Sequence, residues 1–102
     1  MADLLAGGVR VLVYAGDVDF VCNWIGNKAW TIALDWPSHD AFDAAPDTPW
    51  AAAVSENAAG LARAAGGLTF LQVYEAGHLV PMDQPDVALS MLNTFTAAKA
   101  FA

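Results

Sequence analysis

The sequence predicts an α/β fold in which two adjacent parallel strands are covered by helices. Residues 9–14 and 68–74 are almost continuously apolar and rich in β-branched and aromatic residues, as interior strands of parallel sheets are. Each segment is followed by a turn and, further on, by a stretch with apolar residues at helical spacing. Connections between parallel strands are right-handed, so we expect the two strands to lie side by side with helices on the faces of the sheet.

The first strand, residues 9–14, ends at the turn 15–19. A helix is expected over about residues 23–34, because apolar side chains recur there at helical spacing and Pro37 stops the pattern. Gly26 lowers helix propensity by about 1 kcal/mol, so we expect a close packing contact at that position.

The middle of the chain is less regular. Residues 38–49 are polar and rich in Pro and Asp, which indicates a surface loop. In residues 50–65 the alanine content favours a helix, whereas Gly60 and the lack of a clean apolar stripe favour a less regular structure.

The second strand, residues 68–74, leads through the turn 75–78 to a final helix expected over about residues 85–99. Pro85 suits the first turn of a helix, and Asp86 is favourable near the positive end of the helix dipole. The expected buried stripe of this helix consists of Val87, Met91, Leu92 and Phe95.

The composition indicates that this segment is part of something larger. Hydrophobic residues make up 57% of the 102 residues and charged residues only 15%, which is less charge than a free-standing small domain carries. Two strands alone would also leave at least one long apolar edge of the sheet exposed.

The charge excludes several classes of partner. Eleven acidic residues stand against four basic ones, and Arg10, Lys28, Arg63 and Lys99 are scattered. Nucleic acid and anionic membrane surfaces are therefore not expected as partners. No apolar run reaches the roughly 18 residues of a membrane span, and the first residues do not resemble a signal peptide.

Acidic residues follow the first strand and a histidine follows the second. Asp17 and Asp19 lie in one turn and His78 in the other, so all three are expected on the same rim of the sheet. An acid followed by a histidine matches the second half of a Ser, Asp, His triad, in which the carboxylate orients the imidazole. The simpler alternative is that the histidine is an ordinary turn residue and the aspartates cap a helix.

Two longer motifs favour the triad. Residues 14–30, YAGDVDFVCNWIGNKAW, and residues 76–85, AGHLVPMDQP, resemble the acid-bearing and histidine-bearing segments of serine carboxypeptidases, especially the carboxypeptidase Y type. The resemblance extends from about residue 9 to residue 95. It implies that residues 1–102 form the C-terminal segment of a catalytic domain with the α/β-hydrolase fold.

The resemblance also implies roles for individual residues. Asp19 would be the triad acid and His78 the general base, with the carboxylate roughly 2.6–3.2 Å from the imidazole Nδ1, while Asp17 would organise its own turn. Cys22, Leu79 and Met82 would lie near the substrate, although Cys22 is equally well explained as a small buried hydrophobic residue. Leu79 and Met82 depart from the residues commoner in the family.

The nucleophile of such a triad is missing from the sequence. None of Ser38, Ser55 and Ser90 has the Gly-x-Ser-x-Gly surroundings of a nucleophile elbow. The expected partners are therefore a peptide substrate and an N-terminal remainder of the enzyme that carries the serine. The resemblance implies no metal or organic cofactor and a vacuolar, lysosomal or secreted location.

The sequence allows four other interpretations to be compared with a serine carboxypeptidase. A carboxypeptidase-like acyltransferase would keep the same triad, and a non-catalytic remnant would serve only as a binding surface. A cysteine protease built on Cys22 and His78 is disfavoured, because neither residue has the local sequence of one. The acidic loop around His39 lacks the ligand spacing of a metal site, so a solvated loop is the better interpretation.

Overall fold

The two predicted strands lie side by side and run parallel. The structure, a computed structural model, describes residues 1–20, 23–52 and 57–101. Strand β1 (Val11–Gly16) pairs with strand β4 (Leu68–Val73) in a register that runs from Val11 opposite Leu68 to Gly16 opposite Val73. The predicted parallel pair is thus confirmed.

Two further strands extend the sheet beyond β4. Within the described residues the order is β1-β4-β3-β2, with β3 (Gly60–Ala65) antiparallel to β4 and β2 (Thr48–Trp50) antiparallel to β3. Gly66 and Gly67, at φ +57° and +90°, make the tight turn between β3 and β4. This left-handed backbone suits glycine because it has no Cβ.

The helix that alanine favoured within residues 50–65 does not form in the described part of that stretch. Ala62 is fully buried within β3, and a Cβ on Gly60 would lie 2.1 Å from the carbonyl oxygen of Gln72 on β4. Small residues let β3 approach β4 closely, and pairing with a buried strand outweighs the helix propensity of alanine. The surface loop expected over residues 38–49 likewise contains a short helix, α3 (His39–Ala44).

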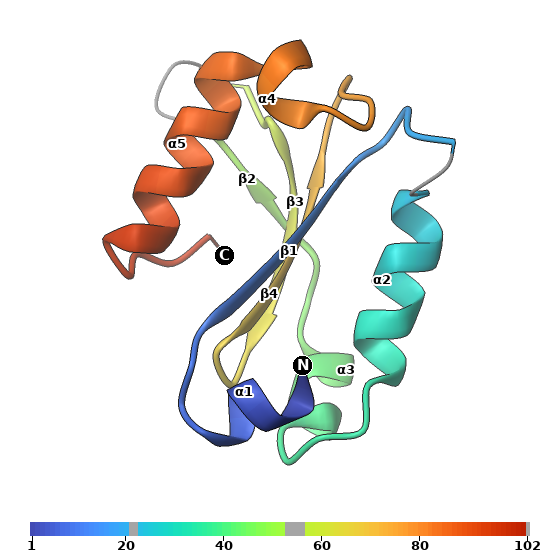
Figure 1. The fold of residues 1–102 in the computed structure, drawn as a ribbon, viewed down its shortest axis with the longest axis vertical. Helices are drawn as coiled ribbons and strands as arrows, with labels where there is room; N and C mark the ends of the chain where they lie inside the picture. Colours follow the sequence, from blue (N-terminus) through green and yellow to red (C-terminus); the bar gives the residue numbers. More distant parts are fainter. Residues whose placement is uncertain (21–22, 53–56, 102) are drawn as a thin grey trace.

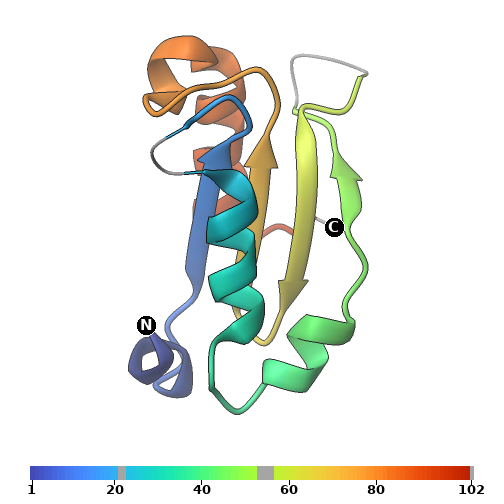
Figure 2. The same cartoon turned by 90° about the vertical axis from the view of Figure 1, so that its right-hand side faces the viewer.

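Helices cover both faces of the sheet (Figures 1 and 2). Helix α2 lies on one face, and α4 and α5 lie on the other. The helices are α1 (Ala2–Ala6), α2 (Trp24–Ala33), α3, α4 (Val80–Asp83) and α5 (Pro85–Thr96). The helices expected over residues 23–34 and 85–99 are therefore present, the second ending three residues early.

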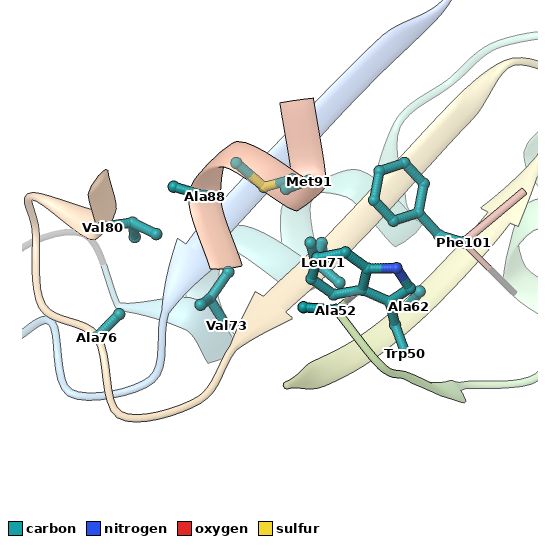
Figure 3. Packing of buried hydrophobic residues seen from close by; sticks show 10 residues of the cluster. All are labelled: Trp50, Ala52, Ala62, Leu71, Val73, Ala76, Val80, Ala88, Met91 and Phe101. Atoms are coloured by element: carbon teal, nitrogen blue, oxygen red, sulfur yellow. The ribbon is translucent and has the colours of Figure 1, made fainter. Parts of the chain in front are cut away.

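Strand β4 is buried on both faces because its alternate side chains enter two different cores. Leu68 and Phe70 belong to the cluster on the side of α2, together with Trp36 and Phe42. On the opposite side, the cluster in Figure 3 comprises Trp50, Ala52, Ala62, Leu71, Val73, Ala76, Val80, Ala88, Met91 and Phe101. This two-sided burial explains why residues 68–74 are a nearly continuous apolar run.

Two expectations about helix packing are wrong. In α5, Ala88 and Met91 are buried, with Val87 and Phe95 partly buried against them, but Leu92 is 55% exposed. The face of α5 turned to the sheet is centred on Ala88 and Met91, so Leu92 falls outside it. A Cβ on Gly26 would meet no described atom within 4 Å, so the expected close contact is absent.

An ion-pair network ties the middle of the chain to the sheet and to α2. Asp47 accepts hydrogen bonds from Lys28 Nζ at 2.6 Å and from Arg63 Nε at 3.0 Å. Burial raises the pKa of the Asp47 carboxyl, but hydrogen bonding and the charges of Arg63 and Lys28 outweigh burial and hold this pKa below its usual value. Among the helices of the described residues, none has the length and apolarity needed to cross a bilayer.

The apolar edge expected from the sequence is present at β1. Within the described residues, β1 pairs with β4 along one side only. A hollow of about 370 Å³ lies beside β1 and α5, and Tyr14 and Leu92 on its wall are 43% and 55% exposed. Its lining residues are Leu12, Tyr14, Pro81, Pro85, Ala88, Leu89, Met91 and Leu92.

Candidate active site

The parallel pairing of β1 and β4 brings two loops to the same end of the sheet (Figure 2). Backbone hydrogen bonds join these loops directly: Asp17 N donates to Val73 O at 3.0 Å, and Val18 N donates to Ala76 O at 3.1 Å. The loop after β1 is therefore held against the loop after β4.

Gly16 allows this close approach. A Cβ at Gly16 would lie 2.1 Å from the carbonyl oxygen of Ala76 and 2.5 Å from that of Gly77, distances that no real side chain tolerates. Glycine is thus required where β1 ends, because the backbone of the next loop occupies the place of a side chain.

Asp19 and His78 meet across the two loops. Asp19 Oδ2 lies 3.0 Å from His78 Nδ1, within the separation expected from the topology. An ionised carboxylate can only accept a hydrogen bond, so Nδ1 is the donor and Nε2 is the ring nitrogen left to take up a proton. The Asp19 side chain is only 6% exposed, whereas that of His78 is 64% exposed. The arrangement couples a shielded carboxylate to an imidazole that remains accessible.

Asp17 turns away from the imidazole, as expected, but among the residues that the structure describes its side chain bonds the neighbouring strand and turn and not its own loop. Its Oδ1 accepts from the backbone N of Glu75 at 2.8 Å, and its Oδ2 lies 3.4 Å from Gln72 Nε2. Both partners belong to β4 and the turn after it, because the parallel register sets the end of β4 directly beside Asp17.

A hollow of about 350 Å³ lies beside the Asp19 and His78 pair. It is lined by Tyr14, Ala15, Gly16, Asp19, Asn27, His78 and Val80. Tyr14 and Asn27 are not among the site residues predicted from the sequence. The sequence signal for Tyr14 was a phenol hydroxyl near the end of an apolar strand. For Asn27 it was a second Asn, one helical turn after Asn23, which caps the helix.

Asn27 is held in place by its own helix. Its Nδ2 donates to the carbonyl oxygen of Asn23 at 3.0 Å, and its Oδ1 accepts from Trp30 Nε1 at 2.9 Å. The first turn of α2 therefore presents an ordered amide to the hollow.

The two expected substrate contacts that the structure describes do not line this hollow. Leu79 and Met82 are 56% and 75% exposed and do not belong to its lining, and Cys22 lies outside the described residues. A role of these three residues in substrate binding stays a prediction.

Neither of the described serines, Ser38 and Ser90, lines the hollow beside the pair. Ser38 contacts Gly66 at the turn that precedes β4, which is the opposite end of the sheet from His78. Ser90 lies within α5 and is not part of the hollow's lining, and Ser55 lies outside the described residues.

Comparisons with known proteins agree with the two motifs. The profile of the family described as serine carboxypeptidase matches residues 1–98. The chain is 48% identical over 94 residues to the Carboxypeptidase Y homolog A of Chaetomium globosum, covering 92% of this chain and 17% of that protein. It is 46% identical over 96 residues to Serine carboxypeptidase-like 48 of Arabidopsis thaliana, covering 94% of this chain and 18% of that protein.

A solved structure shows the same fold. The prohormone-processing carboxypeptidase Kex1(delta)p from Saccharomyces cerevisiae superposes with a TM-score of 0.79 at 27% identity, over 95% of this chain and 21% of that one. The chain thus spans about a fifth of the length of these relatives. Its parallel strands with covering helices correspond to part of an α/β-hydrolase fold, and the chain belongs to the serine carboxypeptidase family.

Proposed function

We propose that this chain supplies the acid and the base of a serine carboxypeptidase, Asp19 and His78, to a serine carried on a second segment. The observation that carries the proposal is the 3.0 Å contact between Asp19 Oδ2 and His78 Nδ1. The predicted reaction removes C-terminal residues from peptides through an acyl-enzyme intermediate.

The chemistry follows from the protonation of the imidazole. As the serine oxygen attacks the scissile carbonyl, its proton passes to His78 Nε2, and the resulting imidazolium then gives that proton to the departing amine. Water repeats the sequence on the acyl-enzyme and regenerates the serine. The shielded carboxylate of Asp19 fixes the tautomer beforehand and stabilises the imidazolium while it exists.

The proposed partner is the N-terminal remainder of such an enzyme, and its proposed docking place is the open side of β1. The part of the relatives that matches this chain makes up between 17% and 32% of their length, so most of their fold is formed by residues outside the matching part. The apolar hollow beside β1 and α5 and the exposed Leu89 and Leu92 offer surface for that contact. By family resemblance the assembled enzyme would act in a vacuole, a lysosome or the extracellular space.

The test is complementation. The chain is co-expressed with the N-terminal part of the Carboxypeptidase Y homolog A of Chaetomium globosum, ending where the similarity to this chain begins. The assembled protein is assayed for release of C-terminal residues from N-blocked peptides, and a serine-directed fluorophosphonate reports the nucleophile. We expect labelling and turnover in the assembly and neither in the 102-residue chain alone.

His78→Ala is the matched control, because it should leave assembly intact and abolish turnover. Labelling of Ser38 or Ser90 in the isolated chain would contradict the proposal. An assembly that forms but hydrolyses no peptide would favour the non-catalytic binding surface. Activated acyl esters offered with an alcohol in the same assay distinguish an acyltransferase from a hydrolase.

A further inference from the structure

The loop that carries His78 is fixed by side chains outside the acid and base pair. We propose that Asp83 is a positioning residue that holds His78 against Asp19 by binding the backbone of Gly77. The inference rests on the proposed function in that it takes His78 as the general base. Asp83 Oδ2 accepts a hydrogen bond from Gly77 N at 2.7 Å, a short distance typical of a charge-assisted bond.

Asp83 reaches back over the turn that it follows. Asp83 is the last residue of α4. The backbone of this helix bonds to Leu79, because Met82 N and Asp83 N donate to Leu79 O at 3.0 and 3.1 Å. The carboxylate of Asp83 then closes a ring onto Gly77. Residues 77–83 thus form a hydrogen-bonded loop whose ends are joined, and His78 is one of its residues.

Gly77 fits this arrangement because a side chain there would displace the carboxylate. A Cβ on Gly77 would lie 2.9 Å from Asp83 Oδ2. Gly77 does not have a left-handed backbone, so an alanine there would meet a crowded carboxylate without a strained φ. Replacement of either residue therefore disturbs the same hydrogen bond from opposite sides.

The other end of the loop is held separately. Glu75 has φ +54°, a conformation that residues other than glycine seldom adopt. Asp17 Oδ1 accepts from Glu75 N at 2.8 Å, and Gln84 Nε2 donates to Glu75 O at 3.2 Å. Because Asp17 and Gln84 fix the loop at Glu75, Asp83 is the side chain that fixes it next to the imidazole.

The experiment has a spectroscopic and a kinetic readout. In the assembled protein, with the 102-residue chain labelled with ¹⁵N, we follow the His78 Nδ1–H proton signal and the exchange rate of the Gly77 amide. In the assembled protein we measure kcat and KM. Asp83→Ala should speed Gly77 exchange, broaden or remove the Nδ1–H signal, and lower kcat by roughly 10- to 100-fold with little change in KM, as a misplaced catalytic group does.

Three further variants separate positioning from a general loss of structure. Asp83→Asn keeps an acceptor of the same shape and should recover part of kcat. Gly77→Ala should reproduce the loss, and combining it with Asp83→Ala should add little, because both remove one contact. Asp86→Asn, which removes a carboxylate from the first turn of α5, should leave every readout unchanged.

The outcomes decide the two proposals separately. If Asp83→Ala and Asp86→Asn behave alike in the Nδ1–H signal and in Gly77 exchange, the positioning role is wrong, even where the assembled wild type is active. If the wild-type assembly is inactive but Asp83→Ala still broadens or removes the Nδ1–H signal, the proposed function fails and the positioning of His78 by Asp83 stands. If Asp83→Ala does not fold, the same readouts on Asp83→Asn and Gly77→Ala decide.

Discussion

The α-carbon of Gly16 faces the carbonyl oxygen of Ala76 so closely that a Cβ there would lie 2.1 Å from that oxygen. This contact sets how near the loop that bears Asp19 can come to the loop that bears His78. Asp19 and His78, 59 positions apart in sequence, meet because the end of β1 carries no side chain at Gly16.

Gly16→Ala should therefore destabilise the protein and separate the two loops. Because the clash involves backbone atoms, we expect a loss of at least about 1–3 kcal/mol in the free energy of unfolding. Denaturant unfolding of the assembled protein measures it. Gly26→Ala is the matched control: a Cβ there would meet no described atom within 4 Å outside its own helix backbone, so the free energy of unfolding should rise by about 0.5–1 kcal/mol. Equal effects of the two substitutions would contradict the close approach at Gly16.

The open side of β1 should make the isolated chain self-associate. An unpaired strand edge beside an apolar hollow is a template for contact with a second copy. Sedimentation velocity should show oligomers or a loosely packed state, and Leu92→Glu, on the wall of the hollow, should shift the distribution toward monomer. A monodisperse wild-type monomer with one sharp, cooperative thermal transition would rule this out.

The Asp47 network should make stability depend on pH in the acidic range. The pKa of Asp47 is lowered in the folded state. The contribution of its carboxylate to stability is therefore fully present above the unfolded-state pKa of about 3.9 and is lost as the pH falls through the folded-state pKa. Asp47→Asn should cost roughly 1 kcal/mol at neutral pH, since about a third of the side chain faces solvent. The difference from wild type should shrink below about pH 4.

Unfolding curves measured across this pH range check the prediction. Asp40→Asn is the control, because the Asp40 side chain is fully exposed and its Oδ1 lies 4.0 Å from His39 Nε2, beyond hydrogen-bonding distance. If the difference in the free energy of unfolding between wild type and Asp47→Asn is the same at neutral pH and at pH 3, the charge of the carboxylate contributes nothing to stability.

The sequence predicts those elements whose apolar residues form a continuous run or recur at helical spacing. Residues 68–74 form β4 because side chains on both of its faces enter a core, and α2 and α5 follow from apolar spacing and terminal residues. Strand β3 could not be predicted from its own residues. Its alanines and glycine favour no strand, and only the free side of β4 makes the segment extended.

The site shows the same division. The order of acids and histidine after parallel strands predicts that an acid and His78 share one rim of the sheet, and the family resemblance implies that this acid is Asp19. The 3.0 Å contact between Asp19 Oδ2 and His78 Nδ1 agrees with both. The partner of Asp17 depends on the register between β1 and β4, and that of Asp83 on how α4 folds back over its own turn. Neither contact has a local signal, because each joins a side chain to the backbone of another turn.

Under the proposed function, Asp19 and not Asp17 orients the imidazole of His78. The most direct test compares Asp19→Asn with Asp17→Asn in the assembled enzyme, since both remove one charge from the same loop. Asp19→Asn should keep the fold and lower kcat by on the order of 10⁴, as loss of the correct imidazole tautomer does in Ser, His, Asp triads. Asp17→Asn should cost far less turnover, because that carboxylate binds Glu75 N and Gln72. A larger loss of kcat in Asp17→Asn than in Asp19→Asn would contradict the assignment.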